Sequence, residues 1–319
     1  MLMRITNNML SSQLLTNLNR NAQAMSHTQE QLSTGRKLNK PSDDPVGITY
    51  SLRYRSELSS NDQYQRNVDS AVSWLDFNDT VLGQAGDVVQ KIRELTVQAS
   101  TGTNPQSALD SINKEVNQLK EQLVDIANSQ LNGKYIFNGQ TYDKKPYDFP
   151  LNADGTHNTT AMLEDGTPNP LSAQAIKTDS GSINFVVGDN VIMPINVTGS
   201  DVFGSGTDGD NLFTIINTIS TALTNGNFSG IGGELANLDT RMETMLKTRA
   251  EMGAKSNRVE LMQNRLSDLG INLTDLQSKT EDADYAGTIL QSKIQENIYN
   301  ASLSAGAKII SPSLMDFLR

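Results

Sequence analysis

Apolar residues recur at helical spacing near both ends of this 319-residue chain, and the spacing is lost in the middle. The N-terminal stripe consists of Ile5, Leu10, Leu14, Leu18, Ala22, Met25 and Leu32, and the C-terminal stripe consists of Leu290, Ile294, Ile298, Ala301, Ala305 and Ile309. Such stripes on otherwise polar segments are typical of amphipathic helices. Roughly from Lys134 to Gly233, Gly, Pro, Asn, Asp and short β-branched runs replace them. We therefore expect the two ends to associate with each other and with other molecules.

The composition argues against several classes of protein. A net charge of −10 disfavours nucleic-acid binding, because neutralising phosphates requires a basic face. The absence of cysteine excludes disulfides and thiolate metal sites. No stretch approaches the ~18 consecutive apolar residues of a membrane span, and no apolar core of a cleaved signal peptide is present. We expect no membrane insertion, and either a cytoplasmic location or an exit from the cell that uses no classical signal.

Three helices are predicted in the N-terminal part. The first covers about residues 6–32 and is followed by Gly35, a residue suited to the C′ position. The second has Asp43 or Asp44 as its N-cap and Pro45 in its first turn, and it extends to about residue 100. Its clearest register is Val81, Ala85, Val88, Ile92, Leu95 and Ala99. The third carries Leu109, Ile112, Val116, Leu119, Leu123 and Ile126, a coiled-coil seam that predicts antiparallel packing against the second.

The middle of the chain predicts a compact, β-containing insert of about ninety residues. Residues 135–139 form a short β run that ends in a turn pair, and weak strands follow around residues 183–187 and 191–197. Asp-Gly pairs and prolines mark turns in the stretch before them. A short helix is expected over residues 211–224.

Helical spacing returns near residue 231 and continues almost to the end of the chain. It includes Ile231, Leu235, Leu238, Met242, Met245, Met252 and Val259, with misses at Arg249 and Ser256, and then slips in phase to Met262, Leu266, Leu269, Leu273 and Leu276. Residues 280–284 offer capping groups for a last helix that stops before Pro312. The predicted fold class is mainly α, a long helical bundle or coiled-coil rod formed by both chain ends with a β-containing inserted domain.

Several segments carry a resemblance to a known family. They are residues 3–9 (MRITNNM), 32–45 (LSTGRKLNKPSDDP), 92–99 (IRELTVQA), 276–285 (LQSKTEDADY) and 313–318 (SLMDFL). In this order they resemble the flagellin superfamily, and within it the hook-associated protein 3 branch, which joins hook to filament. The last segment fits that branch better than it fits a filament flagellin. The resemblance covers about 140 residues at the front and 90 at the back, and none of the middle.

The resemblance implies an architecture in three layers. Residues 1–40 and 281–319 would form inner, channel-lining terminal helices. Residues 41–139 and 231–280 would form a helical rod with a short β-hairpin, and residues 140–230 a variable, β-rich outer domain. It also implies a non-enzymatic structural subunit of the extracellular bacterial flagellum, secreted by type III export without a cleaved signal peptide.

The same resemblance implies partners and leaves alternatives. The expected partners are copies of the chain in a ring-like layer, hook-associated protein 1 on the hook side, flagellin on the filament side, and a cytoplasmic export chaperone with the type III export apparatus. One alternative is flagellin itself, the bulk filament subunit. Another is a secreted enzyme or adhesin that uses the insert, with the helices as a mount.

Two groups of residues are predicted to carry the structural function. Those expected at subunit interfaces are Ile5, Leu10, Leu14, Leu18, Met25, Leu32, Leu290, Ile294, Ile298, Ile309, Leu314 and Phe317. Those expected in the rod core are Val88, Ile92, Leu95, Leu109, Ile112, Val116, Leu119, Leu123, Ile126, Leu235, Leu238, Met242 and Met245. The competing interpretation is that the terminal stripes pack only against each other, within one monomeric bundle.

No catalytic, cofactor-binding or metal-binding residue is predicted. Residues 204–209 match the G-x-G-x-x-G dinucleotide fingerprint, but no βαβ unit surrounds them, so a surface turn is expected. His27 and His157 have no nearby sequence partner for acid–base or metal chemistry. Trp74 is expected in the core. Arg93 and Glu94 could form an ion pair within or between subunits, but a solvated face is favoured, because an exposed pair contributes only ~0–1 kcal/mol.

Overall fold

The computed structural model describes residues 7–163, 165–206 and 209–310. Contacts divide the chain into two compact units, which we describe separately: unit 1, residues 1–62 and 268–319, and unit 2, residues 63–267. The divisions fall inside two long helices, α2 (Pro45–Ser100) and α6 (Phe228–Glu281), so each of these helices contributes to both units.

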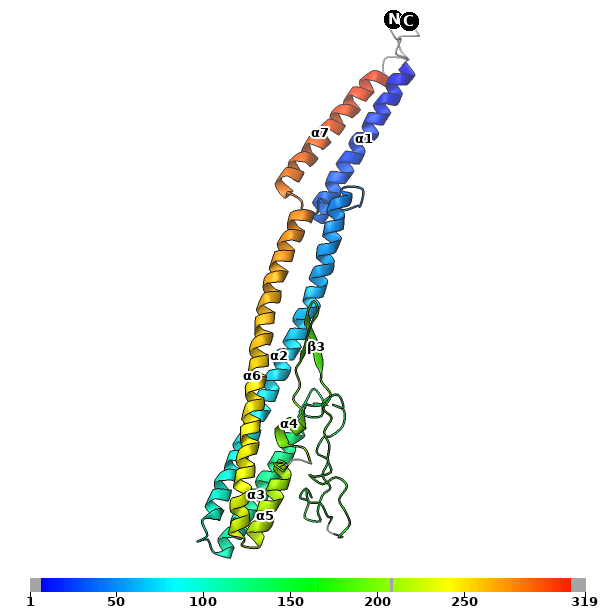
Figure 1. Ribbon diagram of the computed structural model, residues 1–319. Helices are drawn as coiled ribbons and strands as arrows, with labels where there is room; N and C mark the ends of the chain where they lie inside the picture. The colour runs from blue at the N-terminus through cyan, green and yellow to red at the C-terminus, as the bar shows by residue number, and fades with distance from the viewer. Residues whose placement is uncertain (1–6, 164, 207–208, 311–319) are drawn as a thin grey trace, which may run out of the picture. The chain divides into compact units, whose positions relative to one another are not determined.

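Unit 1 pairs two helices from opposite ends of the sequence. They are α1 (Asn7–Thr34) and α7 (Tyr285–Ile310), and they lie side by side (Figure 1). Asn21 Nδ2 donates to Ser302 Oγ at 3.1 Å, and Thr28 Oγ1 donates to Gln295 Oε1 at 2.8 Å. Residue numbers rise on one helix as they fall on the other, so the pair is antiparallel. The prediction that the chain ends associate with each other is confirmed.

Capping residues set the helix ends in unit 1. Gly35 follows α1 with φ +70°, the left-handed conformation expected of a C′ glycine. Asp44 Oδ1 accepts from Val46 N at 3.0 Å at the start of α2, and Asp284 Oδ1 accepts from Ala286 N at 3.1 Å at the start of α7. Of the two candidate caps for α2, Asp44 is therefore the N-cap.

Unit 2 contains a helical bundle of α2, α3 (Gln106–Ala127), α5 (Leu212–Thr224) and α6, with α3 and α5 beside each other (Figure 1). The predicted rod-core positions lie in this bundle. Val88, Ile92, Leu95, Leu109, Ile112, Val116, Leu123, Ile126, Leu238 and Met245 are buried, and Leu119, Leu235 and Met242 are partly buried. Trp74 is buried too.

A seven-residue repeat of buried side chains organises the two long helices. On α6 the repeat is Ile231, Leu238, Met245, Met252, Val259, Leu266 and Leu273, and on α2 it includes Val68, Leu75, Leu82 and Val89. The predicted phase slip after Val259 is wrong, because Leu266 and Leu273 stay in the register while Leu269 and Leu276 are exposed. A sustained heptad requires about 3.5 residues per turn, so it predicts left-handed supercoiling of α6 with its partner.

Polar bridges between α2 and α6 fix their antiparallel register within unit 2. Arg249 Nε donates to Asp79 Oδ1 at 2.8 Å, and Gln263 Nε2 donates to the Asp69 carboxylate at 2.8 Å. Arg93 Nε lies 2.5 Å from an Asp239 carboxylate oxygen. Arg93 therefore forms an ion pair within the chain, the alternative that the sequence left open, and remains partly exposed. Such half-exposed pairs contribute about 0–1 kcal/mol each, so they select register more than they stabilise.

Two small antiparallel hairpins supply the strands of unit 2. The first joins β1 (Gln130–Leu131) to β2 (Lys134–Tyr135) through Asn132 and Gly133, which both have positive φ, as type I′ turns require. The second joins β3 (Asn184–Gly188) to β4 (Val191–Pro194), close to the predicted ranges.

The predicted β run over residues 135–139 is wrong beyond Tyr135. Ile136 and Phe137 are fully buried in turns, and the Phe137 ring packs edge-on against Phe203 at 5.3 Å between centroids. Burial of these side chains, rather than strand pairing, accounts for the apolar run. Phe203 belongs to α4 (Gly199–Phe203), a short helix that the sequence pattern did not predict.

Candidate assembly interface

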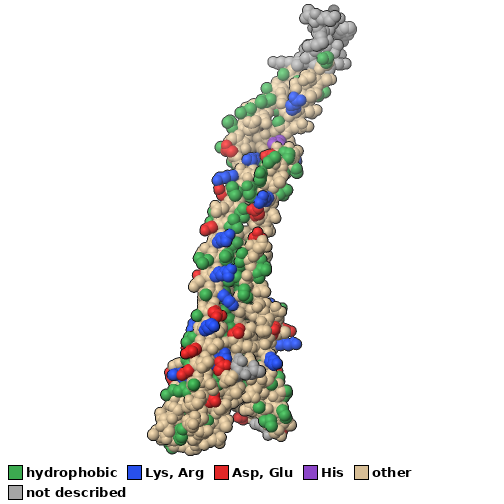
Figure 2. Space-filling model, in the orientation of Figure 1, with side chains coloured by type: hydrophobic (Ala, Val, Ile, Leu, Met, Phe, Trp, Pro, Cys, Tyr) green, Lys and Arg blue, Asp and Glu red, His purple; other side chains and the backbone are tan. Residues whose placement is uncertain are grey.

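Exposed apolar side chains are concentrated in unit 1. Of twenty-three large apolar side chains exposed in the described part of the chain, fourteen belong to unit 1, although it is much the smaller unit. Figure 2 shows apolar side chains on the visible face of these helices. Contiguous exposed apolar surface on a soluble protein marks an interaction site, so unit 1 is the place to look for contacts with other molecules.

The face of α7 toward α1 is polar or small. Its less exposed positions are Thr288, Ser292, Gln295, Tyr299, Ser302 and Gly306, spaced alternately by four and three residues. Two of them, Gln295 and Ser302, hydrogen-bond to α1. The contact with α1 therefore uses a polar face of α7. The apolar side chains of α7 remain free to contact another molecule.

A different face of α7 presents apolar residues to solvent. Leu290 is 63% exposed, Ile294 44% and Ile298 46%, and their four-residue spacing places them on one side of the helix. We call these three residues the α7 stripe. Complete burial of one such side chain contributes about 1.5–3 kcal/mol. A molecule that covers the α7 stripe therefore gains several kilocalories per mole that the isolated chain lacks.

The N-terminal stripe has a different role within the chain. Leu14 on α1 packs against Gly306 so closely that a Cβ at residue 306 would lie 2.8 Å from Leu14 Cδ2. Leu14, Leu18, Met25 and Leu32 are all half-buried. Leu14 thus occupies the space that the missing side chain of Gly306 leaves on α7.

A buried carboxylate, Glu281, joins the segment that follows α1 to the segment that precedes α7. Glu281, 2% exposed, accepts from Arg55 Nε at 2.7 Å, from Ser51 Oγ at 2.5 Å and from Gln277 Nε2 at 3.2 Å. Arg36 Nε lies 3.5 Å from its other oxygen, Oε2. We call these five residues the Glu281 cluster. It joins the α1–α2 connection to the α6–α7 connection.

Backbone pairing reinforces the Glu281 cluster. Lys37 N donates to Glu281 O at 2.7 Å, and Ala283 N donates to Gly35 O at 3.0 Å. Tyr285 Oη also donates to Leu32 O at 2.9 Å. The two connections thus form a short bridge, which makes the positions of α1 and α7 depend on each other.

The electrostatics of the Glu281 cluster favour the ionised carboxylate. Burial alone would raise the pKa of Glu281, but the hydrogen bonds from Arg55 and the other donors outweigh it and lower the pKa to about 2. The carboxylate is therefore charged at neutral pH, where the cluster is complete.

Comparison with known sequences agrees with this geometry. Residues 5–141 match the bacterial flagellin N-terminal helical region, and residues 235–318 match the bacterial flagellin C-terminal helical region. The chain belongs to the flagellin family. It is 28% identical to flagellin of Bacillus subtilis over 295 residues, which cover 89% of this chain and 88% of that protein. It is 33% identical to an Escherichia coli flagellin over 180 residues, 56% of this chain but 30% of that protein.

Solved structures show that the fold of this flagellin-family chain is also that of hook-associated proteins. A flagellar hook-associated protein 3 from Legionella pneumophila matches with a TM-score of 0.58, covering 71% of this chain and 97% of that one at 15% identity. FlgL from Bacillus cereus matches with a TM-score of 0.55, covering 71% and 99% at 19% identity.

The flagellin family and these structural neighbours are structural flagellar proteins, not enzymes. The chain is accordingly a structural subunit of the flagellum. None of the helices in residues 7–310 that the structure describes combines the length and apolarity of a membrane span. Gly204, which opens the G-x-G-x-x-G match, follows helix α4 rather than a strand, so the βαβ context of a dinucleotide site is missing.

Both histidines have carboxylate partners that sequence separation concealed. His27 Nε2 lies 3.3 Å from Asp43 Oδ1, and His157 Nδ1 lies 2.5 Å from Glu121 Oε2. Asp43 also accepts from the backbone of Lys40 and Asn39, and these bonds, more than His27, lower its pKa. Each pair ties a loop to a helix or turn, which is a structural role.

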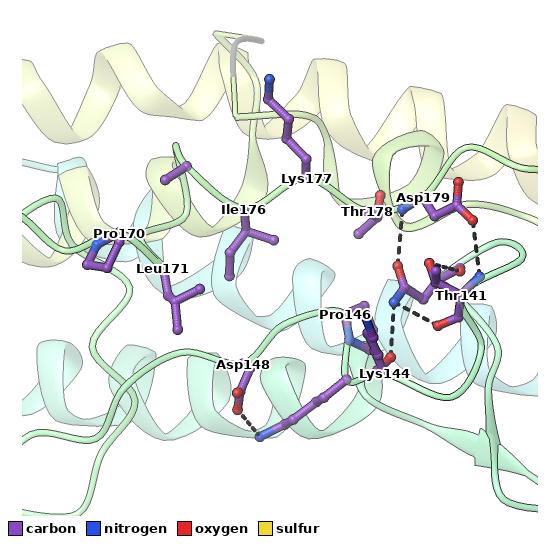
Figure 3. A pocket seen from close by; sticks show the side chains of 13 residues that line it. Thr141, Lys144, Pro146, Asp148, Pro170, Leu171, Ile176, Lys177, Thr178 and Asp179 are labelled. Atoms are coloured by element: carbon purple, nitrogen blue, oxygen red, sulfur yellow. Dashed lines mark hydrogen bonds and ion pairs between the residues drawn. The ribbon is translucent and has the colours of Figure 1, made fainter.

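Polar groups that line a hollow in the insert are hydrogen-bonded to other groups of the insert (Figure 3). The wall of the hollow includes Asn138, whose amide donates to the carbonyls of Thr141 and Lys144 at 3.0 Å each. Lys145 pairs with Asp148 at 3.5 Å, and the Asp179 carboxylate accepts from backbone amides. The groups that line the hollow hold the loops together, so we assign no ligand to it.

The structure distinguishes the residues predicted at subunit interfaces. Leu290, Ile294 and Ile298 are exposed and available to a partner, whereas Leu14, Leu18, Met25 and Leu32 are engaged at least partly within the chain. Ile5, Leu314 and Phe317 lie outside the described residues, as do the side chains of Leu10 and Ile309. The role of all of these residues in assembly stays a prediction.

A second group of exposed apolar side chains in unit 1 was not predicted. It comprises Val46, Tyr50 and Leu52 near the start of α2, Leu269, Ile271 and Leu276 near the end of α6, and Tyr285 and Ile289 at the start of α7. Tyr50 and Tyr54 stack with ring centroids 6.4 Å apart. The four-residue spacing of Val46, Tyr50 and Tyr54 was the available signal.

Proposed function

We propose that this chain is the subunit that joins the flagellar hook to the filament, and that the α7 stripe is covered by neighbouring subunits. The observation that carries the proposal is the orientation of α7: its polar face meets α1, and Leu290, Ile294 and Ile298 remain exposed. When the apolar face of a helix does not pack against its own chain, another molecule that covers this face stabilises the helix.

The proposed assembly follows the predicted layers. Residues 1–40 and 281–319 would form coiled-coil contacts around a central channel, residues 41–139 and 231–280 the rod, and residues 140–230 the outer surface. Copies of the chain would form a ring-like layer, with hook-associated protein 1 below and flagellin above. The fold shared with hook-associated protein 3 structures supports this branch over the filament branch.

We further propose that α1 and α7 become fully ordered only on assembly. Helices of this length with one narrow stripe are marginal outside a larger structure. A loosely ordered terminus also suits passage through a type III export channel with a chaperone. Hydrogen exchange in dilute monomer tests this idea: amides of α1 and α7 should exchange far faster than those of α3. Equal protection of all three helices would contradict it.

Deleting the gene tests the junction function directly. The mutant cells should build complete hooks and secrete flagellin monomer, but should carry no filament. Restoring the gene on a plasmid should restore filaments. Normal filaments in the deletion strain would rule out the junction function.

Flagellin itself is the second candidate, favoured by the 28% identity to Bacillus subtilis flagellin across 88% of that protein. The two candidates differ in polymerisation. A filament subunit should elongate filament seeds without limit, whereas a junction protein should stop after a thin layer. Purified chain added to seeds, followed by electron microscopy, separates the two.

A further inference from the structure

Residues 150–171 of the insert contain two copies of an eleven-residue sequence pattern. Asp154-Gly155-Thr156 recurs as Asp165-Gly166-Thr167, and Asn158 recurs as Asn169. We call residues 150–160 the first turn unit and residues 161–171 the second turn unit; residue 164 lies outside the described part of the chain.

The repeat extends to the backbone. Each unit forms a small antiparallel loop, with a bridge between residues 151 and 157 in the first and between residues 162 and 168 in the second. Three backbone hydrogen bonds of the first unit recur in the second. Asn152 N donates to Thr156 O, as Leu163 N does to Thr167 O, both at 2.8 Å; Gly155 N donates to Asn152 O at 3.0 Å, as Gly166 N does to Leu163 O at 2.9 Å. Asn158 N donates to Pro150 O at 2.7 Å, as Asn169 N does to Ala161 O at 2.9 Å. A shift of eleven residues thus reproduces the same fold.

Side chains repeat the pattern as well. Asp154 Oδ1 accepts from Thr156 N at 2.9 Å and from Thr156 Oγ1 at 2.6 Å, and Asp165 accepts from Thr167 at the same two distances. Each aspartate closes the turn in which its glycine adopts a positive φ, +84° in the first unit and +80° in the second.

Two buried asparagines tie the units to each other. Asn158 Nδ2 donates to Met162 O of the second unit at 3.2 Å. Asn169 Nδ2 donates back to Asn158 O and Thr160 O of the first unit, at 3.1 and 2.9 Å. The units therefore stack through side-chain bonds in both directions. The asparagine of a further unit could donate to Asn169 O as Asn169 Nδ2 donates to Asn158 O.

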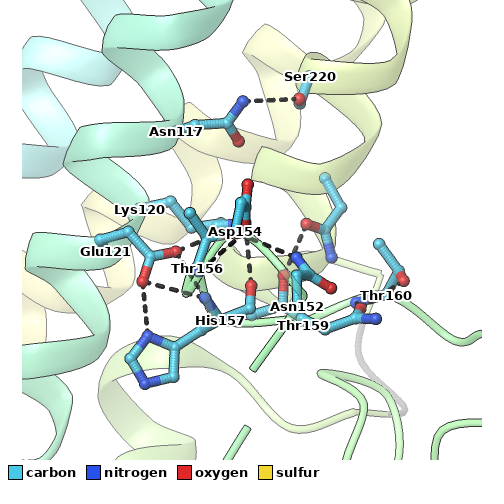
Figure 4. Close-up of polar contacts among 12 residues, drawn as sticks. Asn117, Lys120, Glu121, Asn152, Asp154, Thr156, His157, Thr159, Thr160 and Ser220 are labelled. Carbon is cyan, nitrogen blue, oxygen red and sulfur yellow. Dashed lines mark hydrogen bonds and ion pairs between the residues drawn. The ribbon is translucent and has the colours of Figure 1, made fainter. Parts of the chain in front are cut away.

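Among the described residues, repeated positions of the first unit hydrogen-bond to the bundle, and their counterparts in the second unit do not (Figure 4). His157 N donates to the Glu121 carboxylate at 3.1 Å, Lys120 Nζ donates to His157 O at 3.2 Å, and Thr159 Oγ1 donates to Asn217 Oδ1 at 2.7 Å. The positions of His157 and Thr159 are taken in the second unit by Pro168 and Pro170, which have no backbone N–H to donate.

The chain enters and leaves the second unit at adjacent points. Ala173 N donates to Thr159 O at 3.0 Å. If residues 161–171 were removed, Thr159, Thr160, Ser172 and Ala173 would become consecutive, and the same bond would become the i to i+3 bond of an ordinary β-turn. The two ends to be joined are therefore already as close as the ends of a hydrogen-bonded β-turn.

We propose that the second turn unit is an add-on module that can be removed or duplicated whole, whereas the first turn unit is its fixed base. The segment formed by the turn units could then become longer or shorter in steps of eleven residues without disturbing the helical bundle. This proposal is independent of whether the chain serves at the junction or in the filament.

Matched deletions in the full-length chain test the asymmetry. Deletion of residues 161–171 should leave the Tm within about 3 °C of the wild-type value, and deletion of residues 150–160 should lower it by more than about 5 °C, since it removes the anchors on α3 and α5. A similar loss in both deletions, or tolerance of both, would overturn the proposal.

Insertion variants provide a second, independent test of the proposal. A duplicate of residues 161–171 placed after residue 171 should leave the Tm unchanged, and a scrambled sequence of the same composition should lower it and raise local protease cleavage. Equal behaviour of the duplicate and the scrambled insert would also overturn the proposal.

Discussion

The Arg55 guanidinium donates two hydrogen bonds to the Glu281 carboxylate, Nε to Oε1 at 2.7 Å and Nη2 to Oε2 at 2.5 Å. Such a two-point contact fixes direction as well as distance. Because Arg55 lies on α2 and Glu281 ends α6, this pair holds together the helices from which α1 and α7 depart.

Arg55→Gln should destabilise unit 1. The substitution leaves a buried carboxylate with fewer partners, and breaking buried pairs in this way costs about 3–5 kcal/mol; since Arg55 is partly exposed, we expect about 1–3 kcal/mol. Arg53→Gln is the matched control, because Arg53 forms an exposed ion pair with Glu57 one turn further along the same helix. Urea unfolding measures both. Equal losses of stability would show that the Glu281 contact is no more important than a surface pair.

The same carboxylate predicts a pH dependence. The pKa of Glu281 is about 2 in the folded chain and near 4.5 when unfolded, so its contribution is complete above pH 4.5 and is lost as the pH falls toward 2. At 1.36 kcal/mol per pKa unit, the loss is about 3 kcal/mol. Glu281→Gln should flatten the stability profile between pH 2 and 4.5. A profile as steep as that of the wild type would assign the acid sensitivity to other groups.

Leu14→Asp should separate α1 from α7 within one chain. Leu14 packs on Gly306, and a carboxylate placed there would be partly buried without a partner, at about 1–3 kcal/mol. Because the α1–α7 pair is already marginal in the free chain, far-UV circular dichroism of the monomer should show that the helix still present in it is lost. Leu15→Asp is the control, because Leu15 is 61% exposed. Unchanged helicity in Leu14→Asp would mean that the α1–α7 pair is not formed in the free chain.

Gly253→Ala should stabilise the protein. Gly253 lies inside α6, and nothing lies within 4 Å of the Cβ that alanine would add. Removing glycine from a helix interior gains about 0.5–1 kcal/mol. Thermal unfolding should show a higher Tm with no change in helicity. A lower Tm would indicate that α6 bends at this position.

Much of this fold was predictable because helical periodicity is a local signal. The seam of α3, the range of α5 and the association of the chain ends were all predicted from spacing and turn residues. The heptad of α6 was also present in the sequence, but mixed apolar positions such as Leu269 obscured it. Only burial separates Leu266 from Leu269.

The candidate interface was less predictable because it depends on which face of a helix is already occupied. The apolar spacing of α7 identified Leu290 and Ile294, yet it could not show that α1 would take a different, polar face. Glu281 was expected only to contribute to a cap, since its partners Ser51 and Arg55 are more than two hundred residues away in sequence. Long-range polar pairing of this kind leaves no local pattern.

The most direct test of the α7 stripe as an assembly surface is incorporation of Ile298→Asp into flagella. Asn300→Asp is the matched control, because residue 300 is an exposed polar position on the same helix, on another side from the α7 stripe. Both variants should fold and be secreted at wild-type amounts, and quantitative blotting of sheared flagella should find Asn300→Asp but not Ile298→Asp. Wild-type incorporation of Ile298→Asp would contradict the assignment of the α7 stripe as the assembly surface.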